Sequence, residues 1–369
     1  MKEIVAKSFI DNCLGVYKLK YDDEKLIDIS KIGENDKYDY IILPPIVDIH
    51  THGMLGLSSE TEKLCELSSN YLSRGVGGYL ATIGPRSYEK YRELFYKYRN
   101  FKKAQSSGAV FLGVHLEGPH LNKDKCGAID PNNIYDIDID KFESFVKENN
   151  DLIKIMTIAP ETKNASKAIE ILVKNGIIPS FGHTKCNYEL ACSLFDKYQV
   201  NITHTFNAMN SLHHRDPNMI TAALLYETAT CEVIGDGYHL QLPIIKLLLR
   251  LKNKNNIIFV SDGGEESGYQ YKEGFKFSDG STVKGGAIIR EDGVVAGSTK
   301  DLANVINYLY ENKIVSINDL SSYFSLNAMK RLNISYNHFL NNGEYFFNVY
   351  DKNLNLHNTF VSNKIYQML

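Results

Sequence analysis

The feature of this 369-residue sequence that most limits its fold is a regular alternation of short apolar runs with longer amphipathic segments. The apolar runs span residues 40–50, 77–83, 110–118, 153–161, 177–184, 201–206, 230–237 and 256–264. Near-continuous apolar runs are typical of strands buried on both faces of a parallel sheet. Helix-like segments lie between many of them, at residues 58–75, 87–105, 139–150, 164–176 and 187–198. Strands alternating with helices predict βα units, and eight such units fit a TIM-type (β/α)8 barrel.

The two ends of the chain follow a different pattern. Residues 1–43 read as short β-type pieces with turn signals, and residues 344–366 alternate polar and apolar side chains around a turn. We therefore expect an α/β protein whose residues 44–339 form the barrel and whose residues 1–43 and 340–369 form a small β-sandwich module. Within the barrel region, residues 267–286 read as a polar surface excursion, and the sequence after residue 285 reads as helical.

Composition argues against several classes of protein. The 41 Lys and Arg residues are balanced by 44 Asp and Glu, so no basic excess favours nucleic acid as a partner. No run of about 18 apolar residues predicts a membrane span, and charges within residues 1–21 argue against a signal peptide. The cysteines are scattered without zinc-finger spacing, which favours free thiols in a cytoplasmic protein; they are Cys13, Cys65, Cys126, Cys186, Cys192 and Cys231.

Histidine and acidic side chains stand where five of the apolar runs end. They are His50 at the end of the first run and His52 just after it, Glu117 in the third, His183 in the fifth, His204 in the sixth and Asp262 in the eighth. Residues i and i+2 of an extended chain point to one face, so His50 and His52 can grip one metal ion together. The carboxyl ends of barrel strands meet on one face. Imidazole and carboxylate groups there suit zinc and related first-row divalent ions.

Such a cluster has the chemistry to hydrolyse an amide. A divalent ion polarises a carbonyl and lowers the pKa of its bound water from 15.7 to about 7. Asp262 is then placed to take a proton from the attacking water and deliver it to the leaving nitrogen. An HxH pair alone is weak evidence for a metal, and a lone strand histidine is more often an ordinary core residue. The prediction rests on the coincidence of such residues at five strand ends.

The ordered motifs resemble the amidohydrolase superfamily and, within it, the N-acetylglucosamine-6-phosphate deacetylases. The matching stretches are PPIVDIHTHG at 44–53, GVHLEGPHLN at 113–122, FGHTKCNYE at 181–189, THTFNAMNSLHHRDP at 203–217, IGDGYH at 234–239, VSDGGEESG at 260–268 and VAGSTKDL at 295–302. They follow the family order across most of the chain. The resemblance implies metal-dependent hydrolysis of the acetamide of N-acetylglucosamine 6-phosphate, giving glucosamine 6-phosphate and acetate.

The resemblance also implies a metal centre. Glu117, His183 and His204 look like the ligands of the main ion, and His50 and His52 look like ligands of a second, with Glu117 between the two. Some family members lack the second site, so one or two divalent ions are expected. Zinc is the first candidate, and iron, manganese and cobalt are the alternatives.

The same resemblance assigns the remaining site residues. Asp262 looks like the catalytic acid and base. Asn207, the backbone of Ala208 and Arg215 resemble the segment that binds the phosphate, and His239 looks like a sugar or phosphate contact. A guanidinium binds phosphate oxygens in pairs, which agrees with that role for Arg215. In the family this arginine is supplied across a dimer interface, which implies a homodimer.

Two departures from the family pattern bear on the substrate. Ile129 stands where family members usually carry a histidine, and His120 is a nearby candidate to replace it. Gly263 and Gly264 replace bulkier residues, which predicts a less filled pocket. The rival functions are therefore an amidohydrolase acting on another N-acetyl-hexosamine phosphate, a cyclic amide or an N-acyl amino acid, and a non-catalytic sugar-phosphate sensor.

Overall fold

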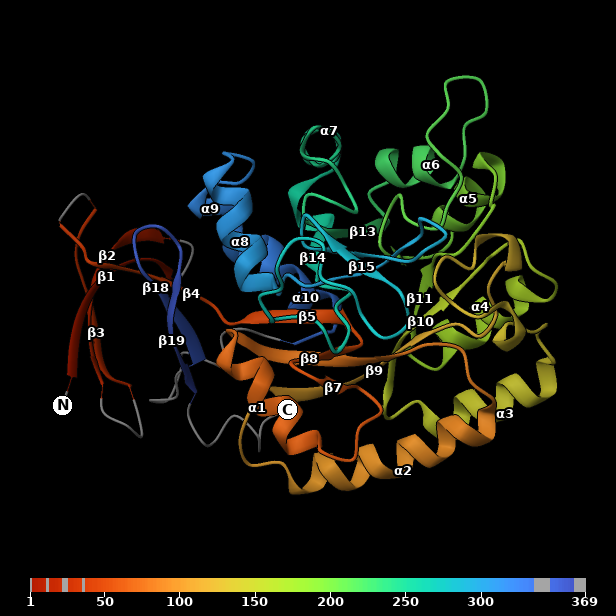
Figure 1. Ribbon diagram of the computed structural model, residues 1–369, viewed down its shortest axis with the longest axis horizontal. Coiled ribbons are helices and arrows are strands. Elements are labelled where there is room, and N and C mark those ends of the chain that lie inside the picture. Colours follow the sequence, from red (N-terminus) through yellow and green to blue (C-terminus); the bar gives the residue numbers. More distant parts are fainter. Residues whose placement is uncertain (1, 11–12, 22–25, 35–36, 335–345, 362–369) are drawn as a thin grey trace.

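Eight parallel strands form the barrel at the centre of the molecule (Figure 1). The computed structural model describes residues 2–10, 13–21, 26–34, 37–334 and 346–361. Around the barrel the strands follow chain order: β5 (Ile46–Thr51), β8 (Val76–Ile83), β9 (Val110–Glu117), β10 (Ile153–Ile158), β11 (Ile178–Phe181), β12 (Val200–Ile202), β13 (Ala229–Ile234) and β14 (Ile257–Val260). Nearly every residue of these strands is buried, as the apolar runs predict.

The barrel closes between its last and first strands. The backbone N–H of Asp262 donates to the carbonyl of His50 at 2.9 Å, and the N–H of His52 donates to the carbonyl of Gly263 at 2.7 Å. The hydroxyl of Ser261 donates to the carboxylate of Asp48 at 2.5 Å beside them. This seam lies at the carboxyl ends of β5 and β14, so the residues that close the barrel are also those predicted to form the site.

Helices cover the outside of the barrel and connect its strands (Figure 1). Five of them begin at a polar side chain that accepts a hydrogen bond from the backbone of the first turn, as is typical of helix N-caps; these residues are Ser87, Asp138, Asn187, Asn218 and Asp301. The helices are α1 (Leu64–Ser73), α2 (Tyr88–Ala104), α3 (Ile139–Asn149), α4 (Ala165–Lys174), α5 (Tyr188–Phe195), α6 (Met219–Leu225), α7 (Leu242–Leu251), α8 (Leu302–Glu311), α9 (Ile317–Ser321) and α10 (Asn327–Arg331).

The two ends of the chain meet in a second sheet, which lies beside the barrel (Figure 1). Its order is β19 (Leu356–Val361), β18 (Phe346–Tyr350), β4 (Tyr40–Leu43), β1 (Lys2–Ile10), β2 (Cys13–Tyr21) and β3 (Leu26–Gly33). β18 pairs with β4, so a strand from the end of the chain completes a sheet begun by its start. The predicted fold class, an α/β barrel with a β module from both termini, is confirmed.

The predicted boundaries of the module fall partly outside the described residues. The predicted border at 43–44 falls between β4 and β5. The other border, at 339–340, and residues 362–369 lie outside the described residues, so the division of the chain into two domains stays a prediction. Among the residues described, no helix has both the length and the apolar character needed to cross a membrane.

Two local predictions need correction. The predicted helix at 58–75 begins only at Leu64, because the preceding residues form a short hairpin, β6 (Gly53–Met54) and β7 (Leu57–Ser58). The prediction of helix directly after residue 285 is wrong: the chain first forms a three-stranded sheet from β15 (Thr282–Lys284), β16 (Ala287–Ile289) and β17 (Val295–Ser298). These strands are only three or four residues long, so their sequence carries little periodic signal.

Candidate metal centre and catalytic site

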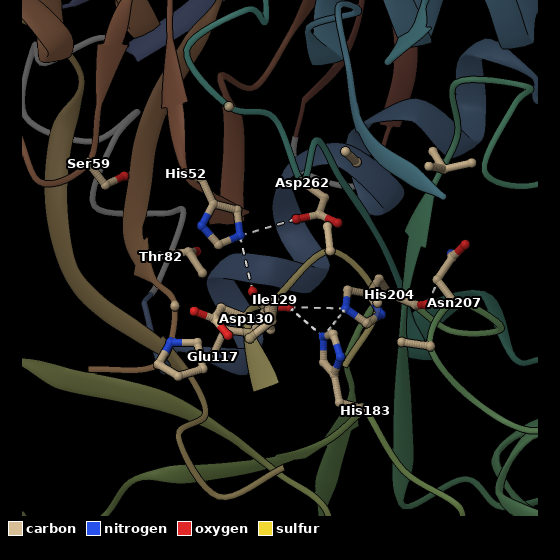
Figure 2. Close-up of a pocket in the computed structure, with 18 of the residues that line it drawn as sticks. His52, Ser59, Thr82, Glu117, Ile129, Asp130, His183, His204, Asn207 and Asp262 are labelled. Atoms are coloured by element: carbon tan, nitrogen blue, oxygen red, sulfur yellow. Dashed lines mark hydrogen bonds and ion pairs between the residues drawn. The ribbon is translucent and has the colours of Figure 1, made fainter. Parts of the chain in front are cut away.

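Five strand ends bring the predicted ligands to one face of the barrel (Figure 2). His50 lies in β5 and His52 directly after it, and Glu117 is the last residue of β9. His183 and His204 each follow their strand by two residues, as does Asp262 after β14; the strands are β11 and β12 for the two histidines. The structure therefore brings together all the residues predicted as metal ligands and the predicted acid and base.

Glu117, His183 and His204 form one compact ligand set. Oε1 of Glu117 lies 3.0 Å from Nε2 of His183 and 3.1 Å from Nε2 of His204, and the two Nε2 atoms are 3.0 Å apart. All three side chains are buried. Three donor atoms that converge this closely can hold one cation.

His50, His52 and Asp262 form a second set beside the first. Oδ1 of Asp262 lies 3.2 Å from Nε2 of His50 and 3.3 Å from Nε2 of His52. Nε2 of His52 is also 3.2 Å from the second carboxylate oxygen of Glu117, Oε2. Glu117 therefore has one oxygen in each set and stands between them, as the resemblance implies.

The orientation of the imidazole rings fits divalent metal ions. Nδ1 of His183 lies 2.8 Å from the carbonyl of Lys125, and only a protonated nitrogen can donate to that oxygen. Nε2 of a neutral His183 then carries a lone pair, which faces Nε2 of His204 and a carboxylate oxygen. Nε2 of His50 is buried and has no hydrogen-bond partner among the described residues. Converging lone pairs of this kind are the donors that a divalent cation requires, so the chemistry of both sets fits the metal.

The backbone at three of these residues adopts an uncommon conformation. The φ angles are 48° at His183, 29° at His204 and 46° at Asp262. Non-glycine residues rarely adopt positive φ, and such strain is concentrated at functional sites. Each of the three lies where a strand ends, so the turn directs its side chain across the barrel mouth.

Electrostatics keep both carboxylates of the site ionised. Burial alone raises the pKa of Glu117, but the adjacent imidazoles of His183 and His204 outweigh this effect and hold that pKa well below its usual range. Burial likewise raises the pKa of Asp262, but the adjacent imidazole of His50 outweighs this effect and holds that pKa well below its usual range. Two negative charges among imidazoles are what one or two dications require.

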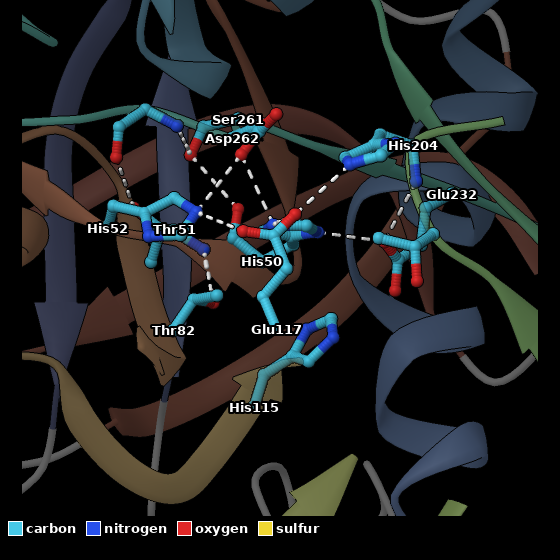
Figure 3. Close-up of polar contacts among 12 residues, drawn as sticks. His50, Thr51, His52, Thr82, His115, Glu117, His204, Glu232, Ser261 and Asp262 are labelled. Atoms are coloured by element: carbon cyan, nitrogen blue, oxygen red, sulfur yellow. Dashed lines mark hydrogen bonds and ion pairs between the residues drawn. The ribbon is translucent and has the colours of Figure 1, made fainter. Parts of the chain in front are cut away.

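A layer of polar groups lies beneath the ligands and is not predicted from the sequence (Figure 3). Glu232 of β13 is fully buried, and its Oε2 lies 3.0 Å from Nδ1 of His50. His115 packs edge-on against His50 at 4.6 Å between ring centroids, and burial lowers its pKa to about 4, so it is neutral. One sequence feature could have indicated Glu232: a carboxylate within an apolar strand is rarely buried unless it is paired with another polar group.

A cavity of about 710 Å³ opens above the two ligand sets. Asn207, Ala208 and His239 line it together with His52, Glu117, His183, His204 and Asp262 (Figure 2). His239 donates from Nδ1 to buried Asp236 at 2.8 Å, an interaction that was not predicted. Burial lowers the pKa of His239, but the hydrogen bond and charge of Asp236 outweigh it and raise that pKa.

Among the predicted site residues, only Arg215 belongs neither to the lining of this cavity nor to the two ligand sets. It lies on the exposed loop of residues 211–217 and is not among the residues that line the cavity. Nη1 of Arg215 lies 2.7 Å from Nε2 of His214 on the same loop. Within one copy of the chain, the described residues therefore leave Asn207, Ala208 and His239 without this guanidinium.

The positions that depart from the family pattern also take definite places. Ile129 lines the cavity, whereas His120 is buried between the hydroxyl of Tyr88 and the carbonyl of Tyr135, at 2.9 and 3.0 Å, and does not line it. His120 therefore does not replace the missing imidazole, because both of its nitrogens are engaged elsewhere.

The glycine pair lies beside two polar side chains. A Cβ atom added at Gly263 would lie 2.7 Å from the hydroxyl of Ser267, and one added at Gly264 would lie 2.9 Å from the carboxylate of Glu266. The expectation of a less filled pocket stays a prediction. Glu266 lines the cavity and brings a carboxylate to the space beside Gly264.

Comparison with known proteins identifies the family. No protein-family model matches the chain. N-acetylglucosamine-6-phosphate deacetylase of Bacillus subtilis is 32% identical over 304 residues, which cover 80% of this chain and 76% of that protein. N-acetylgalactosamine-6-phosphate deacetylase of Escherichia coli is 24% identical over 274 residues, covering 73% and 72% of the two chains.

A solved structure extends the match to nearly the whole chain. The crystal structure of N-acetylglucosamine-6-phosphate deacetylase from Thermotoga maritima superposes with a TM-score of 0.84 at 27% identity, covering 98% of this chain and 97% of that one. The strand order and the ligand sets described above agree with this relationship. The chain belongs to the N-acetylglucosamine-6-phosphate deacetylase family of the amidohydrolase superfamily.

Proposed function

We propose that this protein hydrolyses the acetamide of N-acetylglucosamine 6-phosphate to glucosamine 6-phosphate and acetate. The observation that carries the proposal is the position of Asp262, which lies 3.2 Å from His50 and 3.3 Å from His52 and shares a cavity with Glu117, His183 and His204. A general acid and base next to two metal-ligand sets is the arrangement that amide hydrolysis needs.

The chain's own groups account for binding and proton transfer. When bound by these residues, a divalent ion would supply polarisation of the acetyl carbonyl and would lower the pKa of its bound water. Asp262 is ionised and accepts a proton from the attacking water as the C–O bond forms. It returns that proton to the amide nitrogen as the C–N bond breaks, so acetate and the amino sugar leave. Asn207 and His239, both on the cavity wall, bind and orient the sugar phosphate.

We propose zinc as the metal, in two positions per chain. Glu117, His183 and His204 would hold one ion, and His50 and His52 would hold the other, beside the second carboxylate oxygen of Glu117. Nitrogen and carboxylate ligands also suit iron, manganese and cobalt. Metal analysis of the purified protein decides between them.

We further propose that the active protein is a homodimer in which Arg215 enters the cavity of the partner copy. The support is that Arg215 lies on an exposed loop while the phosphate-binding segment of its own copy lacks a guanidinium. Apolar side chains are exposed near this loop and on the adjoining helices α6 and α7; Leu212, Leu225 and Leu251 are 46%, 63% and 53% exposed. Exposed apolar groups of this kind mark protein interfaces.

A different N-acetyl-hexosamine phosphate is the second candidate substrate. It is favoured by Ile129, which places an apolar side chain on the cavity wall, and by Glu266, whose carboxylate can accept a hydrogen bond from a sugar hydroxyl. The relative that acts on N-acetylgalactosamine 6-phosphate belongs to the same group of similar proteins. Cyclic amides and N-acyl amino acids lack the phosphate for which Arg215 is proposed. A non-catalytic sensor would not need Asp262.

The test is acetate release by the purified protein from N-acetylglucosamine 6-phosphate, N-acetylgalactosamine 6-phosphate and unphosphorylated N-acetylglucosamine. Each is measured before metal chelation, after it, and after zinc, manganese, cobalt or iron is restored. We expect turnover of the phosphorylated glucosamine derivative that chelation abolishes and one of the metals restores. Absence of turnover in metal-loaded protein would refute the proposed reaction, and a preference for the galactosamine derivative would support the second candidate.

We also propose a cytoplasmic location. The cysteines whose side chains the structure describes, which are Cys65, Cys126, Cys186, Cys192 and Cys231, are free thiols, as expected in a reducing compartment.

A further inference from the structure

Glu232 is a buried carboxylate with no place in the chemistry described so far. It lies on β13, inside the barrel and beneath the metal ligands, and is 0% exposed (Figure 3). Barrel interiors are normally filled by branched apolar side chains, and a buried charge is unfavourable unless it is paired and hydrogen-bonded. The burial of this carboxylate therefore has to be explained by the contacts that it makes.

The described residues that contact the carboxylate of Glu232 with a polar atom all do so with a hydrogen-bond donor. Its Oε2 lies 3.0 Å from Nδ1 of His50 and 3.2 Å from the backbone nitrogen of His204, and its Oε1 lies 3.4 Å from the side-chain nitrogen of Asn201. The side-chain oxygen of Asn201 in turn accepts a hydrogen bond of 2.8 Å from Nε of Arg331. This chain of contacts links Glu232 to a cationic group at the base of the barrel.

The contact with His50 fixes which of its ring nitrogens is available. Because a carboxylate only accepts, Nδ1 of His50 carries the proton and Nε2 keeps its lone pair toward the cavity side. A carboxylate behind a ligating histidine also orients the ring and increases its basicity. The same carboxylate also accepts a hydrogen bond from the backbone of His204, so it contacts the turn that carries a ligand of the Glu117, His183 and His204 set.

His115 does not compete for this role. Its Nδ1 lies 2.9 Å from the carbonyl of Ile49 and its Nε2 lies 2.8 Å from the hydroxyl of Thr157, so both nitrogens are engaged. Although His50, His115 and Glu232 lie close enough together to suggest a third metal site, the ring nitrogens of His115 have no lone pair free for an ion. Glu232 therefore acts on His50 itself.

We propose that Glu232 is a positioning residue that holds His50 as a metal ligand and thereby sets the affinity of the second metal position. The inference rests on the proposed function only in taking the His50 and His52 set as that position. Loss of the carboxylate frees the ring to rotate and to exchange its tautomer, and the second ion then binds more weakly. The first set, Glu117, His183 and His204, keeps all of its ligands.

The test counts metal ions. Wild-type protein and Glu232→Gln are stripped with a chelator and titrated with Zn²⁺ in equilibrium dialysis, and metal content is measured by mass spectrometry. We expect two ions per wild-type chain. In Glu232→Gln, we expect the second ion to bind about 10- to 100-fold more weakly, while the first stays within about threefold of wild type. An amide cannot accept from all three donors, so this variant removes both the charge and one hydrogen bond.

Two further variants serve as controls for this measurement. Asp236→Asn is the matched control, because Asp236 is also a buried carboxylate next to β13 that bonds a histidine, His239, outside both ligand sets; its binding of two ions should equal wild type. Glu232→Asp keeps the charge and withdraws the oxygens by about one carbon–carbon bond, about 1.5 Å. It should weaken the second ion less than Glu232→Gln does, and it carries the test if Glu232→Gln does not fold.

Three results would overturn the inference: a wild type that binds a single ion, a Glu232 variant that binds both ions as wild type does, or equal weakening of both ions. Turnover of N-acetylglucosamine 6-phosphate is measured on the same samples. Wild type with two ions and no turnover would refute the proposed reaction and leave the role of Glu232 intact. Wild type with one ion and full turnover would refute the role of Glu232 and leave the proposed reaction intact.

Discussion

At the scale of single residues, the backbone conformation at the strand ends decides where the chemistry lies. His183, His204 and Asp262 all have positive φ, a conformation that a non-glycine residue adopts at a cost of about 1–3 kcal/mol. The hydrogen bonds of the barrel seam hold Asp262 in place, since its own N–H donates to the carbonyl of His50. The backbone strain is therefore found at the residues whose side chains converge on the candidate metal centre.

Replacing Asp262 by Asn tests its role as acid and base. A carboxamide cannot accept the proton of the attacking water, so kcat should fall by about 10²- to 10⁴-fold. Glu117, His183 and His204 are unchanged, so the variant should retain at least one ion. Acetate release and metal content are measured together, with Asp196→Asn on the exposed end of α5 as control. Full activity of Asp262→Asn would exclude this residue as the proton carrier.

Replacing Gly263 by Ala tests the packing behind the seam. The added methyl would lie 2.7 Å from the hydroxyl and 2.8 Å from Cβ of Ser267, which is closer than packed atoms can approach. We expect the free energy of unfolding to drop by about 1–3 kcal/mol. At Gly84 a Cβ meets nothing within 4 Å, so Gly84→Ala should stay within about 0.5 kcal/mol of wild type. Denaturant unfolding compares the two, and equal stability of both variants would contradict this account.

At the scale of elements, the strands and their polar ends are predictable, and their partners are less so. The apolar runs correspond to β5 and β8 through β14 because a strand buried on both faces must be apolar along its length. The ligands are predictable because each ends such a run. Glu232 is not, because one carboxylate within a strand produces no periodic signal. The short strands β15 to β17 and the location of Arg215 depend on tertiary contacts that local sequence does not encode.

Two helix N-caps should respond to pH with opposite sign. Asp301 accepts from the backbone of Asn304 at the start of α8, and burial raises its pKa. Asp138 caps α3, and its hydrogen bond from the backbone of Lys141 lowers its pKa. A raised pKa means that the folded state binds more protons, so the Asp301 contribution to stability is lost as pH rises above the usual aspartate range. The Asp138 contribution is instead lost as pH falls into that range.

The measurement uses Asp301→Asn and Asp138→Asn, since asparagine is also a good N-cap. Unfolding free energies are compared with wild type between about pH 3 and pH 8. Relative to wild type, Asp301→Asn should gain stability as pH rises, and Asp138→Asn should gain it as pH falls. If the unfolding free energies of both variants changed with pH in the same direction relative to wild type, burial would not account for a difference between the two caps.

At the scale of the whole molecule, the start and end of the chain join in one sheet beside the barrel. A β module from both termini is predictable because both ends read as β-type sequence. The pairing of β18 with β4 is not, because it joins segments about 300 residues apart and local patterns carry no information on such partners. The same limit applies to Arg215, which does not line the cavity that the described residues form above the ligand sets.

Subunit mixing tests the proposed dimer. Arg215→Ala and Asp262→Asn should each be nearly inactive alone. If Arg215 serves the partner copy, a mixed dimer contains one intact site, so equal amounts of the two variants, dissociated and reassociated, should regain about a quarter of wild-type activity. Activity is measured before and after mixing, and two copies of the same variant serve as control. No recovery in dimers shown to have exchanged would place Arg215 in its own copy's site.

The seam between β5 and β14 also bears on how the protein is made. His50 and Ser261 meet there, although 211 residues separate them along the chain. A ribosome therefore releases the histidines of β5, β11 and β12 well before Asp262 exists and the barrel can close. A growing chain exposes several metal-binding side chains without the geometry that selects among ions. The set of His50, His52 and Asp262 is therefore complete only after the chain has been synthesised past residue 262, whereas Glu117, His183 and His204 are all present earlier.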